Sequence, residues 1–495
     1  MLAQSSIPFR RKSNKSPGNP VVLIPGDAGS QLEANLTGKP EVVHYICSKL
    51  TLDYFDLWLN LESFSPVAID CWVDNMKLVY NTTSGLSSNM PGVDIRVPGF
   101  SATETIEWLD PSNASTGSYF FTLVDMMAQW GYKRGKSVVA APYDWRKSPV
   151  ENDGYFVLLK SLIELTYRYN QNQKVIILAH SMGNPAMLYF YKNYVDQAWK
   201  DKYIQSHVSL AAAWGGSMQI IRLYVSGYNM NYYRIILPPS SLRSMQRSFT
   251  SSAFLFPSKA VWGPDEILAY TAEKNYTLRD VKDLFYDANY PMGWQQYKKH
   301  AELLGDLDAP GVEVHCIYGL GVPTPDSFTW AKGYFPDYPP LVTYGDGDGT
   351  VNKKSSEVCT RWNEANNHGK KVSVHVLPNT EHMAIMQMTS QKMKSFAILA
   401  IVAAVAFAQH TRPTPNPCQI CEYVVGQAEH RLRGPIDKGE LQVFLLADCE
   451  SLRRFEGQAA TDACIQLIDT NIDLIYNDVK NGKHARDVCV DLKQC

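Results

Sequence analysis

A chain of 495 residues, 45% of them hydrophobic, is long enough to bury a large core and to hold more than one domain. Its formal net charge of −2 argues against a nucleic-acid binder, which would need a basic surface. Aromatic residues make up 12% of the chain, a content that suits apolar surfaces that also meet water.

The N-terminal twenty residues are polar and basic and lack the apolar centre of a secretion signal. The cysteines and sequons nevertheless favour an oxidising compartment, because even numbers of cysteines lie in two regions of the chain. Four are Cys47, Cys71, Cys316 and Cys359, and the other six lie between Cys418 and Cys495. We therefore expect disulfide bonds, an oxidising compartment, and glycosylation at Asn35, Asn81, Asn113 and Asn275.

Two features stand out early in the chain. Val21 to Asp27 is predicted to be a strand that runs into a glycine-containing loop. Between Cys47 and Cys71, apolar residues crowd a short segment at positions 54, 55, 57, 58, 59 and 61. Such a loop predicts either a foot that inserts into membranes or a satellite core packed on the main domain, and the pattern alone favours neither.

The stretch around Ser181 has the pattern of a nucleophile elbow. Residues 155–169 have helical spacing and lead through a polar turn into the apolar run 175–178, a predicted strand. Ala179-His180-Ser181-Met182-Gly183 follows, and a helix is predicted from Pro185 to Lys192. This is G-x-S-x-G with alanine in the first place, a turn that holds a serine hydroxyl above the sheet edge. The pattern also arises by chance, so its meaning depends on partners further along the chain.

The later elements supply such partners. Residues 208–216 read as a strand and a glycine hinge, and 217–247, without clean periodicity, as a mobile lid. Further strands at 314–319, 341–344 and 372–377 indicate a doubly wound α/β sheet. An acidic glycine-rich turn, 345–351, follows one strand, and His382 follows the last. Serine, aspartate and histidine in this order are typical of α/β-hydrolases, with the amides of Asp27 and Met182 as candidate oxyanion donors. An ordinary turn at Asp27 is the alternative.

A signal-like segment lies inside the chain. Met393-Lys394-Ser395 precedes an apolar run, Phe396 to Ala408, which ends in an A-x-A pattern. A buried helix or a re-entrant segment is the alternative, because the run is short for a bilayer span. We expect a polar segment 1–19, a main domain 20–392, the signal-like segment 393–409 and a cysteine-rich domain 410–495. A genuine fusion and a merger of two gene products would both produce this arrangement.

Residues from about 20 to 390 resemble the lecithin:cholesterol acyltransferase family. They look closest to its lysosomal (group XV) phospholipase A2 branch. The resemblance rests on motifs spread over this whole region. They are Pro25-Gly26-Asp27, residues 44–49 (HYICSK), 70–72 (DCW), 141–146 (APYDWR), 179–184 (AHSMGN), 197–203 (QAWKDKY), 321–327 (GVPTPDS), 345–352 (GDGDGTVN) and Glu381-His382.

The resemblance implies an α/β-hydrolase with a lid, acting as a lipid acyl hydrolase and transacylase on membrane glycerophospholipids. Water or a lipid alcohol would accept the acyl group, and no metal or organic cofactor is implied. The residues implied are the nucleophile Ser181, the acid Asp348, the base His382, the disulfides Cys47–Cys71 and Cys316–Cys359, and membrane docking at Trp58, Leu59 and Leu61. The chain departs from the family at 211–213, three alanines, and where the signal-like segment replaces a C-terminal helix.

Residues 418–495 resemble a saposin B-type domain, a small all-α fold stapled by disulfides. The resemblance implies the pairs Cys418–Cys495, Cys421–Cys489 and Cys449–Cys464, which the spacing alone does not determine. Amphipathic helices are predicted at 424–432 and 463–479. Two other functions remain open: a lipid-binding or membrane-perturbing protein acting through this domain, and a sterol acyltransferase acting on lipoproteins.

Overall fold

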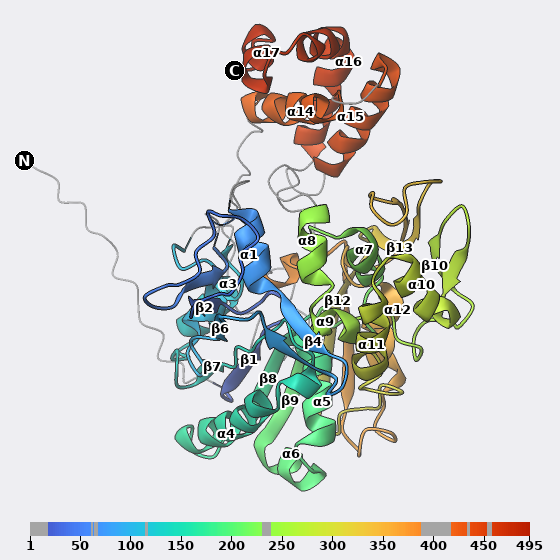
Figure 1. Cartoon of the computed structure of the whole chain (residues 1–495). Helices are drawn as coiled ribbons and strands as arrows, with labels where there is room; N and C mark the ends of the chain where they lie inside the picture. Colours follow the sequence, from blue (N-terminus) through green and yellow to red (C-terminus); the bar gives the residue numbers. More distant parts are fainter. Residues whose placement is uncertain are drawn as a thin grey trace, which may run out of the picture. The chain divides into compact units, whose positions relative to one another are not determined.

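The computed structural model describes residues 18–60, 63, 68–113, 117–229, 239–387, 417–432, 436–452 and 458–495. The chain divides into two compact units, Met1–Phe407 and Ala408–Cys495 (Figure 1). The signal-like segment 393–409 and the middle of the predicted lid, 230–238, lie outside the described residues.

A six-stranded parallel sheet forms the centre of the first unit, so the predicted α/β class is confirmed. The strand order is β15-β12-β9-β8-β1-β7. These strands are β1 (Val21–Ile24), β7 (Val138–Ala140), β8 (Val175–His180), β9 (Ile204–Leu210), β12 (Val314–Leu320) and β15 (Val372–Pro378). All the side chains of β1, β7 and β8 are buried, as expected for parallel strands with both faces covered.

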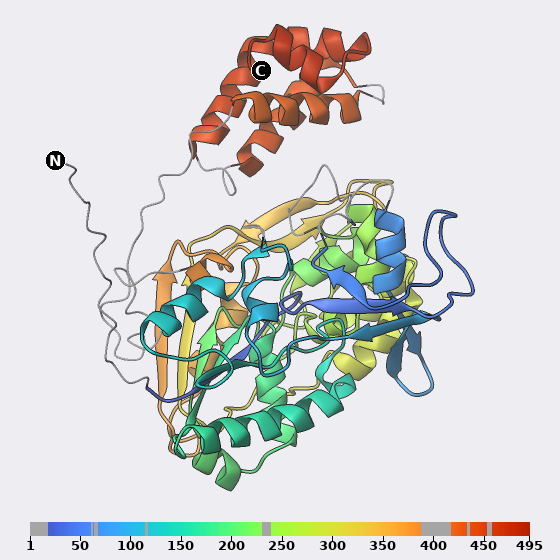
Figure 2. The same cartoon turned by 90° about the vertical axis from the view of Figure 1, so that its left-hand side faces the viewer.

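Alternate side chains of each central strand enter two different cores, because successive strand residues point to opposite faces. Ile177 of β8 packs in the same core as α4 (Asp153–Tyr169) and α5 (Gly183–Asn193). Its neighbour Leu178 packs on the other side with α3 (Phe121–Gln129). Figures 1 and 2 both show α4 at the lower edge of the unit. The sheet is therefore the middle of three layers.

The strand predicted at 341–344 does not belong to this sheet. It is β14 (Leu341–Gly345), which pairs antiparallel with β13 (Thr324–Thr329). They lie in a four-stranded sheet with β10 (Ile267–Tyr270) and β11 (Asn275–Thr277). The smaller sheets comprise β2 (Leu32–Leu36), β3 (Phe55–Trp58) and β6 (Val93–Arg96), and β4 (Leu78–Asn81) with β5 (Leu86–Asn89).

The tract predicted to form a lid contains two helices, α7 (Gln219–Ser226) and α8 (Pro239–Gln246). Ile221 and Tyr224 of α7 are buried in the main core, and the mobility of this tract stays a prediction. The other short helices are α1 (Ile69–Met76), α2 (Glu104–Glu107), α6 (Gln197–Tyr203), α9 (Thr250–Phe254), α10 (Val281–Asp287), α11 (Pro291–His300), α12 (Lys353–Ser356), η3 (Pro149–Glu151), η4 (Leu278–Asp280), η5 (Glu357–Arg361) and η6 (Ala384–Gln387).

Every described element of the second unit is an α-helix. Its helices are α14 (Pro417–Arg431), α15 (Lys438–Leu452), α16 (Gln458–Lys480) and α17 (Ala485–Asp491). The structure joins Cys418 to Cys495, Cys421 to Cys489 and Cys449 to Cys464, the pairs that the saposin resemblance implies. A unit this small gains much of its stability from such bonds, which restrict the unfolded chain. Across the described parts of both units, no helix is long and apolar enough to cross a membrane.

Candidate active site

The elbow at Ser181 packs closely against the loop after β1 because Gly26 in that loop and Gly183 in α5 have no side chains. Ser181 joins β8 to α5 with φ 52°, a left-handed conformation that few non-glycine residues adopt. A Cβ on Gly26 would lie 2.7 Å from Ser181 Cβ, and one on Gly183 would lie 2.6 Å from the carbonyl oxygen of Pro25. The loop after β1 therefore touches the elbow directly.

The structure brings the three predicted triad residues together. His382 Nε2 lies 2.9 Å from Ser181 Oγ, and His382 Nδ1 lies 2.7 Å from Asp348 Oδ2. The other carboxylate oxygen of Asp348 accepts hydrogen bonds from the amides of Thr350 and Val351 at 3.0 and 2.7 Å. The His382 amide donates to the Asp348 carbonyl oxygen at 2.9 Å. Asp348 thus holds both the ring and the backbone of His382.

The loop that carries Asp348 is anchored to the end of β12 rather than to β14 alone. Asp348 forms an isolated bridge with Val322, two residues beyond β12, and Val322 N donates to Gly347 O at 3.0 Å. Gly349 N donates to Thr324 Oγ1 at 2.8 Å. These contacts place the carboxylate at the carboxyl edge of the parallel sheet, where α/β folds assemble their sites.

The two candidate oxyanion donors are the amides of Asp27 and Met182, which directly follow the contacting residues Gly26 and Ser181. Within the part of the chain that the structure describes, neither the Asp27 amide nor the Met182 amide donates a hydrogen bond. Asp27 is exposed, yet the protein packed around its carboxyl partly desolvates it, and this desolvation raises the pKa of Asp27 to about 7. Below that pH the carboxyl is neutral and does not repel an anion formed beside it.

Three further residues of this site were missed by the sequence reasoning. Tyr119 and His180 join the loop after β1 to the His382 backbone through buried hydrogen bonds. This loop, residues 25–29, carries the candidate donor Asp27 and is called the oxyanion loop below. Asn184 donates from its side chain to the carbonyl oxygens of Ala179 and Ser181 at 3.2 and 3.1 Å. His180 could have been found from the sequence, because it ends an apolar strand and a buried imidazole needs a hydrogen-bond partner.

Membrane docking through Trp58 and Leu59 is a prediction that the structure corrects. Trp58 Nε1 donates to Ala28 O at 2.8 Å and its ring packs against Trp145, while Leu59 is only 9% exposed. Both residues therefore pack in or against the main core of the first unit and not in a separate satellite core, and Leu61 lies outside the described residues.

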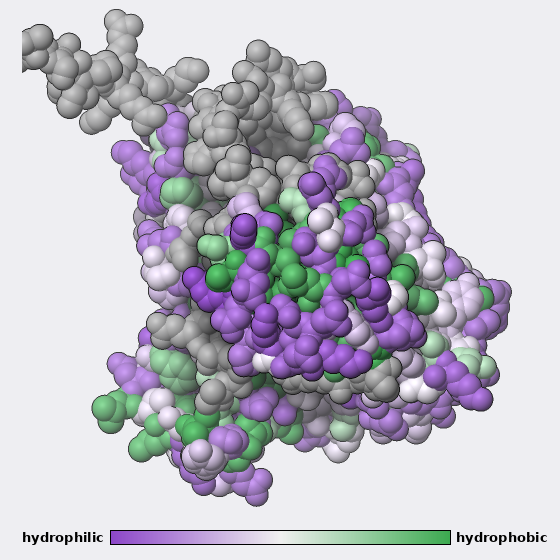
Figure 3. All heavy atoms as spheres, turned by 90° about the horizontal axis from the view of Figure 1, so that it is seen from above, coloured by the Kyte–Doolittle hydropathy of each residue, from purple (hydrophilic) through white to green (hydrophobic). Residues whose placement is uncertain are grey.

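Other apolar side chains within this disulfide loop and in the few residues before it are exposed. They are Val43, Tyr45, Ile46, Leu50 and Leu52, of which Leu52 is fully exposed. Figure 3 shows hydrophobic side chains protruding at its lower left, on the side where the loop after β2 lies. Cys47–Cys71 ties this loop to α1, and Cys316–Cys359 ties β12 to η5, as the resemblance implies.

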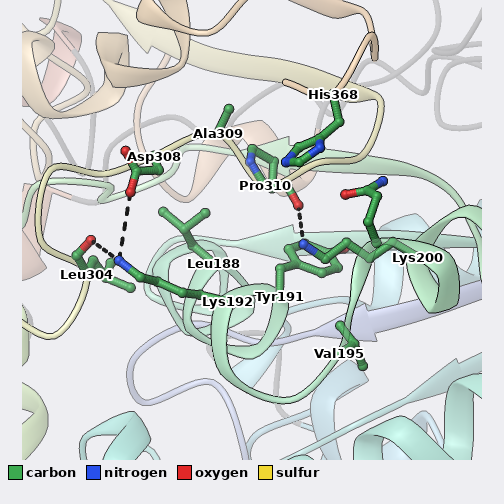
Figure 4. A pocket seen from close by; sticks show the side chains of 11 residues that line it. Leu188, Tyr191, Lys192, Val195, Lys200, Leu304, Asp308, Ala309, Pro310 and His368 are labelled. Carbon is green, nitrogen blue, oxygen red and sulfur yellow. Dashed lines mark hydrogen bonds and ion pairs between the residues drawn. The ribbon is translucent and has the colours of Figure 1, made fainter. Parts of the chain in front are cut away.

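One cavity of about 250 Å³ lies away from the triad, between α5, α6 and the segment 304–310 (Figure 4). Lys192 Nζ donates to Leu304 O at 3.5 Å and lies 3.8 Å from Asp308, and Lys200 Nζ donates to Pro310 O at 3.0 Å. Both cations are thus already partnered within the protein. None of the lining residues belongs to the triad, so this cavity is not the candidate active site.

The sequons differ in accessibility. Asn81, Asn113 and Asn275 are exposed, whereas Asn35 lies half-buried in β2 and its Oδ1 accepts a hydrogen bond from Thr51 Oγ1 at 2.9 Å.

Comparisons with known proteins identify the family of this chain. Residues 54–394 match the lecithin:cholesterol acyltransferase family. The chain belongs to this family. "Lysosomal phospholipase A and acyltransferase" of Rattus norvegicus is 47% identical over 78% of this chain and 90% of that protein, and its Homo sapiens counterpart is 46% identical over the same shares. "Phosphatidylcholine-sterol acyltransferase" of Homo sapiens is 41% identical over 72% of this chain and 79% of that protein.

Among solved structures, the crystal structure of the Tle4–Tli4 complex matches with a TM-score of 0.43 and 14% identity, over 76% of this chain and 96% of that chain. Family membership therefore rests on the sequence matches and not on this structural likeness.

Proposed function

We propose that this protein is a serine-dependent lipid acyl hydrolase and O-acyltransferase that acts on membrane glycerophospholipids. The observation that carries the proposal is the His382 ring, which lies within hydrogen-bond distance of both Ser181 Oγ and Asp348 Oδ2. The names of the relatives support a lipid ester as substrate. Their lysosomal naming and the disulfides of this chain support a lysosomal or secreted location.

In this mechanism His382 Nε2 takes the proton of Ser181 as Oγ attacks the carbonyl carbon of a fatty ester. The bond to the leaving lipid alcohol breaks, that alcohol takes the proton from His382, and Ser181 carries the acyl group. Water or a second lipid alcohol then gives its proton to His382 and attacks the acyl-enzyme. Oγ leaves with the proton, and the product is a fatty acid or a new ester. Asp348 orients the imidazole and stabilises the imidazolium that forms twice in each cycle.

The amides of Asp27 and Met182 would hold the negative oxygen of each tetrahedral intermediate. A protonated Asp27 carboxyl suits this role, because a carboxylate beside the intermediate would raise its energy. The exposed side chains of Tyr45, Leu50 and Leu52 support docking on a lipid surface, since each would bury apolar area on insertion.

Ser181→Ala tests the proposal. Hydrolysis of phosphatidylcholine vesicles and of a soluble p-nitrophenyl ester should both fall by on the order of 10⁴-fold or more, because triad members act as a unit. Circular dichroism and the melting temperature should match wild type, since the serine side chain is small and half-exposed. Turnover near that of wild type would refute the assignment.

A sterol as acyl acceptor is the second candidate, favoured by the 41% identity to a phosphatidylcholine-sterol acyltransferase. Product analysis with a ceramide-type alcohol and with cholesterol in the same vesicles separates the two acceptors. A cholesteryl ester as the main transfer product would replace the proposal of a non-sterol lipid acceptor.

A further inference from the structure

Tyr119 and His180 form a buried chain of hydrogen bonds behind the triad. Gly26 N–H donates to the Tyr119 hydroxyl oxygen at 3.0 Å. That oxygen lies 2.6 Å from His180 Nδ1, and His180 Nε2 lies 3.2 Å from the carbonyl oxygen of His382. The chain therefore links the loop that carries one candidate oxyanion donor to the backbone of the general base.

The partners allow one consistent arrangement of protons. The carbonyl oxygen of His382 can only accept, so His180 Nε2 carries a proton and donates it. Burial, and then the proximity of His382, hold the pKa of His180 well below its ordinary value, so the ring is neutral and Nδ1 is free to accept. Tyr119 then donates its O–H to Nδ1 while its oxygen accepts from Gly26. All three donors point in the same direction along the chain.

The surroundings leave this network little room to move. Tyr119 and His180 are 4% and 1% exposed. A Cβ on Gly29 would lie 2.7 Å from Tyr119 Cε1, so the Tyr119 ring rests directly on the oxyanion loop. The centroids of the His180 and His382 rings are 4.9 Å apart. A charge on His180 would oppose the imidazolium that forms on His382 during the reaction, and a neutral ring avoids this repulsion.

We infer that Tyr119 and His180 are positioning residues that fix the oxyanion loop relative to the general base His382. They touch neither substrate nor the reacting atoms and act through Gly26 and His382. The inference rests on the proposed function, because it assigns the two residues to the geometry of that reaction. Loss of these hydrogen bonds should reduce the rate of the chemical step more than the binding of substrate. A misplacement of a reacting group by about 1 Å can lower that rate on the order of 100-fold.

Tyr119→Phe removes only the hydroxyl. For a soluble p-nitrophenyl ester we expect kcat to fall about 10- to 100-fold, with KM within about threefold of wild type. Tyr132→Phe is the matched control. Tyr132 is also buried in the core of Tyr119, and its hydroxyl donates to Asn19 O at 3.0 Å, away from the triad. It should lose similar thermal stability but keep kcat within about twofold of wild type. Equal kcat in the two variants would overturn the inference.

His180→Gln provides a second, independent break. A glutamine amide at the position of Nε2 retains a donor to His382 O, but its acceptor, Oε1, is displaced from the position of Nδ1 that Tyr119 contacts. Because this variant and Tyr119→Phe break the same link, their combination should reduce kcat barely more than either alone. Additive losses would contradict a shared network, and His180→Gln with wild-type kcat would contradict it even if Tyr119→Phe failed to fold.

Ser181→Ala in the same assay separates this inference from the proposed function. If Ser181→Ala is inactive and Tyr119→Phe matches its control, only the positioning role fails. If Ser181→Ala retains activity, the proposed function itself fails. Labelling by a fluorophosphonate probe should remain complete but slower in Tyr119→Phe, which shows that the nucleophile is present.

Discussion

Replacing Gly26 with alanine tests the close approach of the oxyanion loop to the nucleophile. The new Cβ would lie 2.7 Å from Ser181 Cβ and 3.0 Å from the backbone oxygen of His180, where ordinary contact begins at 3.4 Å. Relief of the shorter contact requires the loop to move by about 0.7 Å. A change of rotamer cannot provide this, because Cβ atoms and backbone do not rotate away.

That movement carries the Asp27 amide away from the forming oxyanion. Removal of one oxyanion donor costs on the order of 100- to 1000-fold in kcat, and a partial displacement should cost about 100-fold. KM for a small soluble ester should change by less than about threefold, because the loop contributes mainly after attack. Gly26 does not have a positive φ, so alanine adds no backbone strain of its own.

The assay compares Gly26→Ala with Gly154→Ala, a glycine in α4 whose added Cβ would have open space. The control should be stabilised by about 0.5–1 kcal/mol, as glycine-to-alanine changes in helices are, with wild-type turnover. A kcat for Gly26→Ala within about threefold of the control would refute the argument from the contact distances.

Three further predictions follow from the same structure. Because the pKa of Asp27 is raised to about 7, wild-type kcat/KM should fall as pH rises through 7, and Asp27→Asn should retain activity there; an unchanged alkaline limb would contradict this. Leu50→Ser with Leu52→Ser should weaken turnover of vesicles about tenfold or more while sparing a soluble ester, since both side chains are exposed; equal losses would instead indicate misfolding. The piece 1–392 behind a supplied signal should match the full chain in soluble-ester turnover, because every triad residue precedes the join; aggregation of that piece beside an active full chain would show that the later segment is needed to fold it.

The sequence by itself determined the local parts of the site. The apolar run before Ser181 and the small residues around it predict the strand, sharp turn and helix that the structure has as β8, the elbow and α5. These features depend on neighbours in the chain: a buried parallel strand needs apolar residues throughout, and a turn with a left-handed serine needs little bulk nearby. The order of serine, aspartate and histidine followed from family resemblance and strand positions.

Only the tertiary structure decided the long-range contacts. Nothing near Asp348 in sequence shows that its loop bridges to Val322, beyond a strand of another sheet. The apolar residues between Cys47 and Cys71 read alike in sequence, yet Trp58 is packed against Trp145 while Leu52 is exposed. Tyr119 and His180 are 61 positions apart. Their contact arises because α3 and β8 pack on a common core, and such packing depends on the fold as a whole and not on any local pattern.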